Sequence, residues 1–300
     1  AISAQTDDFT PADKKMYALR NITATVSHVS LIASSVMSKK LALTTDGILL
    51  DVKCGNGAFM KTFPQAIELA RTMVAIGNAA GRRTRAIISS MDAPLGFAVG
   101  NALEVWEAWR VLQGKGARDL TELCIELAAQ MLYLAGHREL LACRRQAREG
   151  LSSGRAREKF LEMVAAQGGN IEIFTGKEPF PAAPYCSDLT APQSGYLAIV
   201  DTEALGRAAR LLSIKRINRE KIDNTIDDTA GIYLRQKTGA YVTKGEPFLT
   251  LYSAEKKCPP AVMDLLQQAF AFHRAPPQLT PLLLAQIDER GKVFDCPALD

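Results

Sequence analysis

The chain has 300 residues, 47% of them apolar, which is enough to build one large or two medium hydrophobic cores. Its 36 Lys and Arg against 32 Asp and Glu leave a formal charge of +4, too small an excess to indicate a nucleic-acid-binding surface. No apolar run approaches the roughly 18 residues of a membrane span, and Asp7 and Asp8 interrupt any signal-peptide core. We therefore expect a cytoplasmic protein that binds neither membranes nor nucleic acid.

Cysteine and histidine show no pattern typical of a metal site. The six cysteines lie at irregular distances without a CxxC pair, and the three histidines are far apart in the sequence. We therefore predict neither a zinc site nor a disulfide framework. The chain begins with Ala1 rather than methionine, which indicates that a segment precedes it.

The first predicted element is a helix. Thr10 can cap it, Pro11 suits its first turn, and the carboxylate of Asp13 faces its positive end. We expect this helix to continue to about Val26.

A second helix is predicted after a short break. Ser30 can cap it, and the apolar positions within 31–41 keep helical spacing. Ser35 and Lys39 are i,i+4 neighbours on this helix, so their side chains lie on one face.

After the second helix, the pattern of apolar residues changes to one that predicts a parallel sheet. A strand over 47–52, a helix over 63–80 and a strand over 84–88 predict a right-handed parallel crossover. Ligands of open parallel sheets bind beyond the carboxyl ends of the strands. These ends are 53–57 and 89–96, and both loops contain glycine, so both are candidate sites.

The remainder of the chain is helical first and strand-rich later. Prolines between Pro179 and Pro192 exclude a helix there and indicate a linker, in which we place a domain boundary. Helices are predicted at 101–112, 119–135, 138–149 and 154–167, and strands at 195–201, 231–236 and 246–252. This pattern predicts a small β-rich C-terminal domain.

Ordered motifs run through most of the chain. They are Lys15–Arg20, Thr23–Val26, Leu31–Ser35, Met37–Ala42, Leu50–Lys53, Gly57–Lys61, Pro94–Val105, Met163–Gly169 and Gly245–Pro247. On these motifs, from about Gln5 to about residue 275, the chain resembles the thymidine/pyrimidine-nucleoside phosphorylase family. The bacterial type that accepts both uridine and thymidine is the most similar in pattern.

The resemblance implies a pentosyltransferase that converts uridine, thymidine or deoxyuridine and phosphate reversibly into free base and α-(deoxy)ribose 1-phosphate. Members act in nucleoside salvage and catabolism, form homodimers, use inorganic phosphate as co-substrate and need no organic cofactor. The implied fold is α/β, with a small helical domain, a large α/β domain with a parallel or mixed sheet, and a β-rich C-terminal α+β domain. In this chain we expect residues 1–43 to be the remainder of the base-binding helical domain, 44–190 the central domain and 191–300 the C-terminal domain.

Cationic donors suit this reaction because cleavage of the glycosidic bond places negative charge on the departing pyrimidine. By resemblance, Arg20, Ser35 and Lys39 match the base-binding positions, with Arg20 and Lys39 as catalytic donors to the base carbonyls and the Ser35 hydroxyl near the ring nitrogen. Val26 and Val36 match the apolar walls of that pocket. Without the resemblance, Arg20 and Lys39 would be interpreted as solvated helix charges and the valines as core residues.

The resemblance also implies a monovalent cation, potassium in the family, held by oxygen ligands. Leu95 and Ala98 match these positions through their backbone carbonyls, and Glu107 matches through its carboxylate. The alternative is that Glu107 is an ordinary carboxylate on the helix that carries Trp106 and Trp109.

The family's phosphate loop, a Lys-x-Ser-Thr-Gly-Gly-like motif upstream of the base-binding Arg, has no counterpart in these 300 residues. The Gly55–Gly57 turn follows a different strand and lacks neighbouring Ser or Thr donors. We therefore assign no phosphate-binding residue and expect little turnover by these residues on their own. The family places Asp after the base-binding Arg, whereas this chain has Asn21, which predicts reduced activity.

Two alternatives stay open at this point. The chain can be a catalytically silent remnant, or one half of a split phosphorylase whose partner chain carries the phosphate loop. A phosphoribosyltransferase of the same broad class would need a diphosphate-binding Gly-rich loop, which the sequence does not contain.

Overall fold

The computed structural model describes residues 2, 6, 8–137, 139–218 and 221–296, with the side chains at 21 and 215–225 outside that description. The chain forms two compact units, each built from segments that are distant in the sequence. The first unit comprises residues 1–90, 122–149 and 281–300, and the second comprises 91–121 and 150–280. The domain division expected at residues 43 and 190 stays a prediction.

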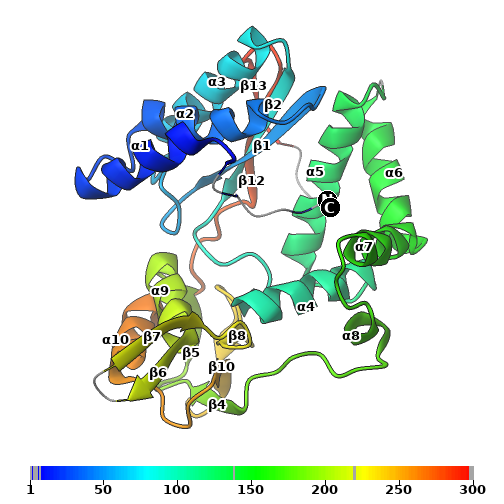
Figure 1. Cartoon of the computed structure of the whole chain (residues 1–300). Coiled ribbons are helices and arrows are strands. Elements are labelled where there is room, and N and C mark those ends of the chain that lie inside the picture. The colour runs from blue at the N-terminus through cyan, green and yellow to red at the C-terminus, as the bar shows by residue number, and fades with distance from the viewer. Residues whose placement is uncertain (1, 3–5, 7, 138, 219–220, 297–300) are drawn as a thin grey trace. The chain divides into compact units, whose positions relative to one another are not determined.

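The first unit contains a mixed four-stranded sheet (Figure 1). Its parallel strands β1 (Gly47–Cys54) and β2 (Arg83–Ser90) are connected by helix α3 (Phe63–Ala79), which confirms the predicted crossover. Strand β12 (Leu283–Ile287) pairs antiparallel with β2, and β13 (Val293–Phe294) pairs with β12. The C-terminal region therefore contributes two strands to the sheet of the first unit.

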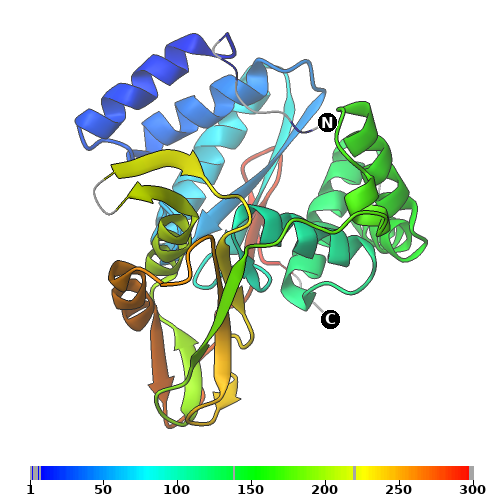
Figure 2. The ribbon, with the colours of Figure 1, turned by 60° about the horizontal axis from the view of Figure 1, so that its bottom comes forward.

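Helices α1 (Pro11–Ile22) and α2 (Val29–Leu41) precede this sheet, and α2 packs against α3 (Figure 2). The helix predicted to reach Val26 is shorter, because Ala24 adopts a left-handed backbone conformation with φ 53°.

Helices α5 (Arg118–Leu134) and α6 (Leu140–Ser152) contribute residues 122–149 to the first unit. Two ion pairs join them, Glu126 with Arg144 and Glu122 with Arg148.

The core of the first unit lies between the sheet and helices α2 and α3. Side-chain burial alternates along strand β1, as expected for a strand with one buried face: Ile48, Leu50 and Val52 are buried and the intervening residues are half-buried. Met37 of α2 and Met73 of α3 are buried in the same core. This packing fixes α2 against α3 and the sheet, and with it the side chains of the candidate site.

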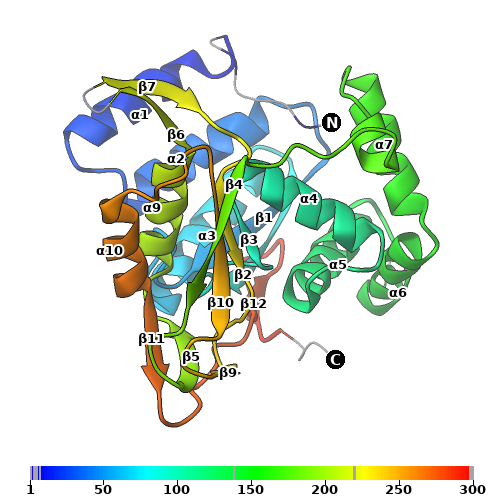
Figure 3. The same cartoon turned by 90° about the horizontal axis from the view of Figure 1, so that it is seen from below.

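The second unit combines short antiparallel sheets with helices (Figure 3). One sheet has the strand order β3-β8-β10-β4, another β11-β5-β9, and β6 pairs with β7. Helices α9 (Thr202–Ser213) and α10 (Pro260–Ala269) lie side by side and share a core with β5, β8 and β10. The remaining elements are helices α4 (Asn101–Leu112), α7 (Arg155–Ala166) and α8 (Glu172–Thr175), and strands β3 (Ala98–Val99), β4 (Tyr185–Thr190), β5 (Gly195–Ile199), β6 (Ile214–Asn218), β7 (Lys221–Ile226), β8 (Gly231–Leu234), β9 (Tyr241–Val242), β10 (Pro247–Ser253) and β11 (Phe270–His273).

The linker predicted over 179–192 is wrong in part, because Tyr185–Thr190 form strand β4, which pairs with β10. The prolines exclude a helix, but Pro184 precedes the strand and leaves the next residues free to pair. The α/β fold with a mixed sheet and a β-rich later part is confirmed. No helix among the described residues is long and apolar enough to cross a membrane.

Candidate functional site

Lys39 lies at the centre of a compact polar cluster on α1 and α2. Its Nζ donates to Asp13 Oδ2 at 2.5 Å, to Ser35 Oγ at 3.1 Å and to the Ser35 carbonyl at 3.2 Å. The Lys39 side chain is 29% exposed, whereas that of Asp13 is only 5% exposed. The structure thus brings together Ser35 and Lys39, both predicted as site residues, and places a buried carboxylate behind the lysine.

Asp13 is a member of this cluster that the site prediction missed. Burial alone would raise its pKa, but hydrogen bonds from Lys39 and Ser35 and the charges of Lys39 and Arg20 together lower the pKa below its usual value. Asp13 therefore stays ionised near neutral pH. The sequence feature that could have indicated Asp13 is its seven-residue spacing from Arg20, which places both side chains on one face of α1.

Arg20 is buried, and its terminal nitrogens donate to the backbone. Nη1 donates to the Leu31 carbonyl at 3.1 Å and Nη2 to the Val26 carbonyl, so Arg20 fastens the turn between α1 and α2. Its Nε is buried and has no hydrogen-bond partner among the described residues. A buried unpaired donor costs about 1–3 kcal/mol, so Nε would gain from an acceptor.

The other residues predicted around the base are placed less directly. Val36 is half-buried and packs on the core beneath α2, while half-buried Val26 contacts Arg20 through its backbone oxygen. Their role as walls of a base pocket stays a prediction. The side chain of Asn21 lies outside the described part of the structure.

The carboxyl ends of β1 and β2, predicted as candidate sites, carry a closed trio of polar side chains. Lys53 Nζ donates to Asp51 Oδ2 at 2.6 Å and to Ser89 Oγ at 2.9 Å, and Ser89 Oγ donates to Asp51 Oδ1 at 2.6 Å. The following loop is tied to itself, since the N–H of Gly55 donates to the Met60 carbonyl at 3.0 Å. These contacts pair the charged groups of Lys53 and Asp51 with one another, and the absence of a phosphate site at Gly55–Gly57 stays a prediction.

Glu107, the predicted cation ligand on α4, is buried and lies against the loop that contains Leu95 and Ala98. Its Oε1 accepts from the Phe97 N–H at 2.7 Å and its Oε2 from the Ala98 N–H at 3.2 Å. Gly96 has φ +69°, and a Cβ there would come within 2.2 Å of Glu107 Oε2, so the approach requires glycine. Both carboxylate oxygens of Glu107 therefore accept backbone N–H groups, and the role of the Leu95 and Ala98 carbonyls as cation ligands stays a prediction. No cluster of three His, Cys, Asp or Glu side chains suited to a metal occurs among the described residues.

Comparison with known proteins identifies two matching families along the chain. Residues 1–157 match the "Glycosyl transferase family, a/b domain", and residues 196–273 match the "Pyrimidine nucleoside phosphorylase C-terminal domain". These two segments include the Lys39 cluster and most of the strands of the second unit, respectively.

Similar curated proteins carry the name pyrimidine-nucleoside phosphorylase. The chain is 47% identical to the protein from Bacillus subtilis (strain 168) over 254 residues, covering 84% of this chain and 58% of the relative. It is 44% identical to that of Geobacillus stearothermophilus over 287 residues, covering 95% of this chain and 65% of the relative. The protein from Staphylococcus aureus (strain USA300) is 46% identical over 254 residues. The chain thus spans between 58% and 65% of the length of the first two relatives.

Proposed function

The chain belongs to the thymidine/pyrimidine-nucleoside phosphorylase family, and on this basis we propose that it acts in the phosphorolysis of pyrimidine nucleosides. The observation that carries the proposal is the cluster of Asp13, Ser35 and Lys39, in which a buried carboxylate holds a partly exposed ammonium group beside a hydroxyl.

In the proposed reaction an oxygen of inorganic phosphate bonds to C1′ of the sugar while the C1′–N1 glycosidic bond breaks. The bonding electron pair leaves with the base, so negative charge develops on the pyrimidine ring and its carbonyl oxygens. A cation beside such an oxygen stabilises the transition state more than the substrate. The phosphate is the co-substrate, and no organic cofactor takes part.

Lys39 is the proposed donor to a base carbonyl. All three of its hydrogens now point at protein acceptors, Asp13 and the two oxygens of Ser35. A base carbonyl can replace the Ser35 hydroxyl as acceptor from Lys39, because the Ser35 oxygen can accept from the N3–H of the pyrimidine ring instead. Asp13 stays ionised and keeps the ammonium group oriented during this exchange.

Arg20 has a different geometry from the one its role as a direct donor requires. Its two terminal nitrogens hold the turn after α1, and only Nε lacks a partner among the described residues. We propose that Arg20 meets the base after the turn at Val26 shifts and releases one of its nitrogens.

Further parts of the proposal rest on the family. A monovalent cation such as potassium would be held by the carbonyls of Leu95 and Ala98 and by Glu107, whose buried carboxylate would supply the negative charge. Homodimer formation and a cytoplasmic location stay predictions of the sequence.

Base release from uridine and thymidine in the presence of phosphate tests the proposed activity, for this chain alone and for the chain supplied with a polypeptide that carries the family's phosphate loop. We expect Lys39→Ala to lower kcat/KM on the order of a hundredfold, as for loss of a transition-state donor. Lys40→Ala is the matched control, because Lys40 is exposed on the same helix and outside the cluster. Equal turnover by the two variants would contradict the assignment. Absence of turnover even with the added polypeptide would favour the silent remnant, and turnover only with it would favour the split form.

A further inference from the structure

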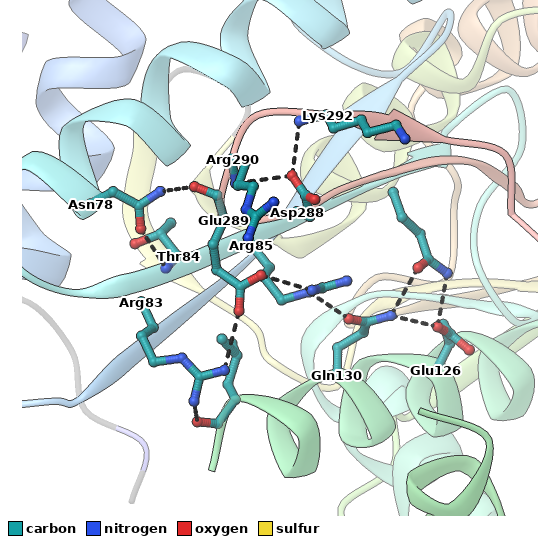
Figure 4. Close-up of polar contacts among 12 residues, drawn as sticks. Asn78, Arg83, Thr84, Arg85, Glu126, Gln130, Asp288, Glu289, Arg290 and Lys292 are labelled. Carbon is teal, nitrogen blue, oxygen red and sulfur yellow. Dashed lines mark hydrogen bonds and ion pairs between the residues drawn. The ribbon is translucent and has the colours of Figure 1, made fainter. Parts of the chain in front are cut away.

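A cavity of about 850 Å³ lies within the first unit, apart from the cluster on α1 and α2. Its walls come from the end of α3, the start of β2, helices α5 and α6, and the turn between β12 and β13, and Figure 4 shows the polar contacts around it. None of its lining residues belongs to α1, to α2 or to the loops after β1 and β2. Five of the residues that line it are arginines: Arg82, Arg83, Arg85, Arg144 and Arg290.

One carboxylate fixes two of these arginines. Glu289 accepts from Arg83 Nη2 at 3.2 Å and from Arg85 Nη1 at 2.9 Å (Figure 4). Burial would raise the pKa of Glu289, but a backbone hydrogen bond and the two arginines outweigh burial and lower it. Glu289 therefore stays ionised and orients both guanidinium groups without neutralising both.

Buried polar side chains hold two arginines from the other wall. Arg85 Nε donates to Gln130 Oε1 at 3.0 Å. Arg144 donates to the two carboxylate oxygens of Glu126 at 2.6 and 3.0 Å, and Glu126 is only 2% exposed. Guanidinium groups held in this way keep their remaining N–H donors in fixed directions, which favours binding of a planar or tetrahedral oxyanion.

The second lining carboxylate, Asp288, is used within its own turn. Its Oδ1 accepts from the backbone N–H of Arg290 and of Lys292, each at 2.9 Å. The side chains of Arg82 and Arg290 make no hydrogen bond or ion pair to any other described residue, and Arg82 is half-buried whereas Arg290 is exposed. The five arginines face Asp288, Glu289 and, behind Arg144, Glu126, which leaves an excess of two positive charges around the cavity.

We propose that this cavity binds a small phosphorylated molecule with several phosphate charges, and that Arg82 and Arg290 are its primary ligands. The volume lies within the range of about 300–1,000 Å³ that is usual for small-molecule sites. The arginines supply bidentate donors suited to phosphoryl oxygens. Tyr133 and Phe294 also line the cavity, with Arg85 Cζ 4.7 Å from the Tyr133 ring centroid and Lys292 Nζ 4.9 Å from that of Phe294, and an organic group can contact the remaining surface of these rings. The proposal does not depend on the activity assigned to the Lys39 cluster.

Calorimetric titration with tripolyphosphate and with a nucleoside triphosphate, at constant ionic strength, tests this inference. We expect saturable binding with a Kd of about 1 mM or below. Arg82→Gln and Arg290→Gln should each weaken binding about tenfold, the effect of one charged hydrogen bond. Because neither side chain makes a hydrogen bond or ion pair to the rest of the described protein, both variants should keep the unsubstituted thermal midpoint. Arg145→Gln is the matched control, since Arg145 is exposed on α6 and does not line the cavity.

The two probes distinguish the possible sources of the phosphate groups. Equal affinity for both probes means that the site recognises the phosphate chain alone. Tighter binding of the nucleotide means that Tyr133 and Phe294 contribute. Either result supports the proposal. Absence of saturable binding up to about 10 mM, or equal weakening by Arg145→Gln and Arg290→Gln, would overturn it.

Discussion

Two clusters in the first unit hold cationic side chains beside carboxylates, and they differ in how the charges balance. On α1 and α2 one buried carboxylate, Asp13, faces one lysine at 2.5 Å. Around the cavity at the start of β2, five arginines face the lining carboxylates Asp288 and Glu289 and the buried Glu126, which pairs with Arg144. A matched pair orients a single donor toward a polar but neutral ligand such as a pyrimidine. An excess of cations favours a ligand that brings its own negative charges.

The comparison also separates two uses of a buried carboxylate. Asp13 holds the group that is proposed to bind substrate, whereas Glu126 holds Arg144 in the wall of the cavity. In both cases burial of the carboxylate costs desolvation energy, which its hydrogen bonds and its cationic partner offset, so removing its charge leaves that cation without compensation. The following predictions test whether the two carboxylates act in this way.

The largest effect is expected at Glu126. Its carboxylate is 2% exposed and bonded to Arg144, Gln130 and Gln286, so Glu126→Gln should lower the free energy of unfolding by about 3 kcal/mol. Glu122→Gln is the control, because Glu122 pairs with Arg148, whose side chain is 46% exposed, and should cost no more than about 1 kcal/mol. Urea unfolding measures both. Similar losses of unfolding free energy in the two variants would show that the contribution of an ion pair to stability does not depend on its burial.

A smaller effect is expected at Asp13. Asp13→Asn replaces a charged hydrogen bond with a neutral one while Lys39 remains 29% exposed, so the free energy of unfolding should fall by about 1–2 kcal/mol. Asp46→Asn, at an exposed position after α2, should leave it unchanged. If the free energies of unfolding of the two variants agree within the error of urea unfolding, Asp13 does not stabilise the fold through this cluster.

The smallest effect concerns pH. The pKa of Asp13 is lowered in the folded protein, so its contribution to stability is complete above the unfolded value of about 3.9 and disappears as the pH falls through the lower folded value. The stability difference between the unsubstituted protein and Asp13→Asn should therefore be constant from pH 7 to about pH 5 and shrink toward zero in stronger acid. A difference that grows as the pH falls would mean that the folded pKa is raised instead.

Local sequence patterns predicted much of the fold. The crossover from β1 through α3 to β2 follows from the change in hydrophobic period, and both strands appear where expected. Helix α9 is not among the predicted elements, although Asp201 caps this helix by accepting from the Ala204 N–H at 2.9 Å. The pairing of β12 with β2 was not predictable from local patterns, because the paired residues are about two hundred positions apart in the sequence.

The two polar clusters show the same division. Ser35 and Lys39 were predicted from family motifs and their spacing on one helix, and the structure joins them. Asp13 was assigned only a helix-start role, because its burial depends on how α1 packs on α2. The arginine cavity has no sequence signature, since its walls come from segments that meet only in the folded first unit.

Titration of uracil into the protein tests the central claim, that the Lys39 cluster binds the pyrimidine. Calorimetry of the unsubstituted protein, Lys39→Ala and Lys40→Ala supplies the comparison. Loss of one charged hydrogen bond should weaken binding at least about tenfold in Lys39→Ala, while Lys40→Ala should bind as the unsubstituted protein does. Equal uracil affinity in all three proteins, or no saturable binding by the unsubstituted protein, would contradict the claim.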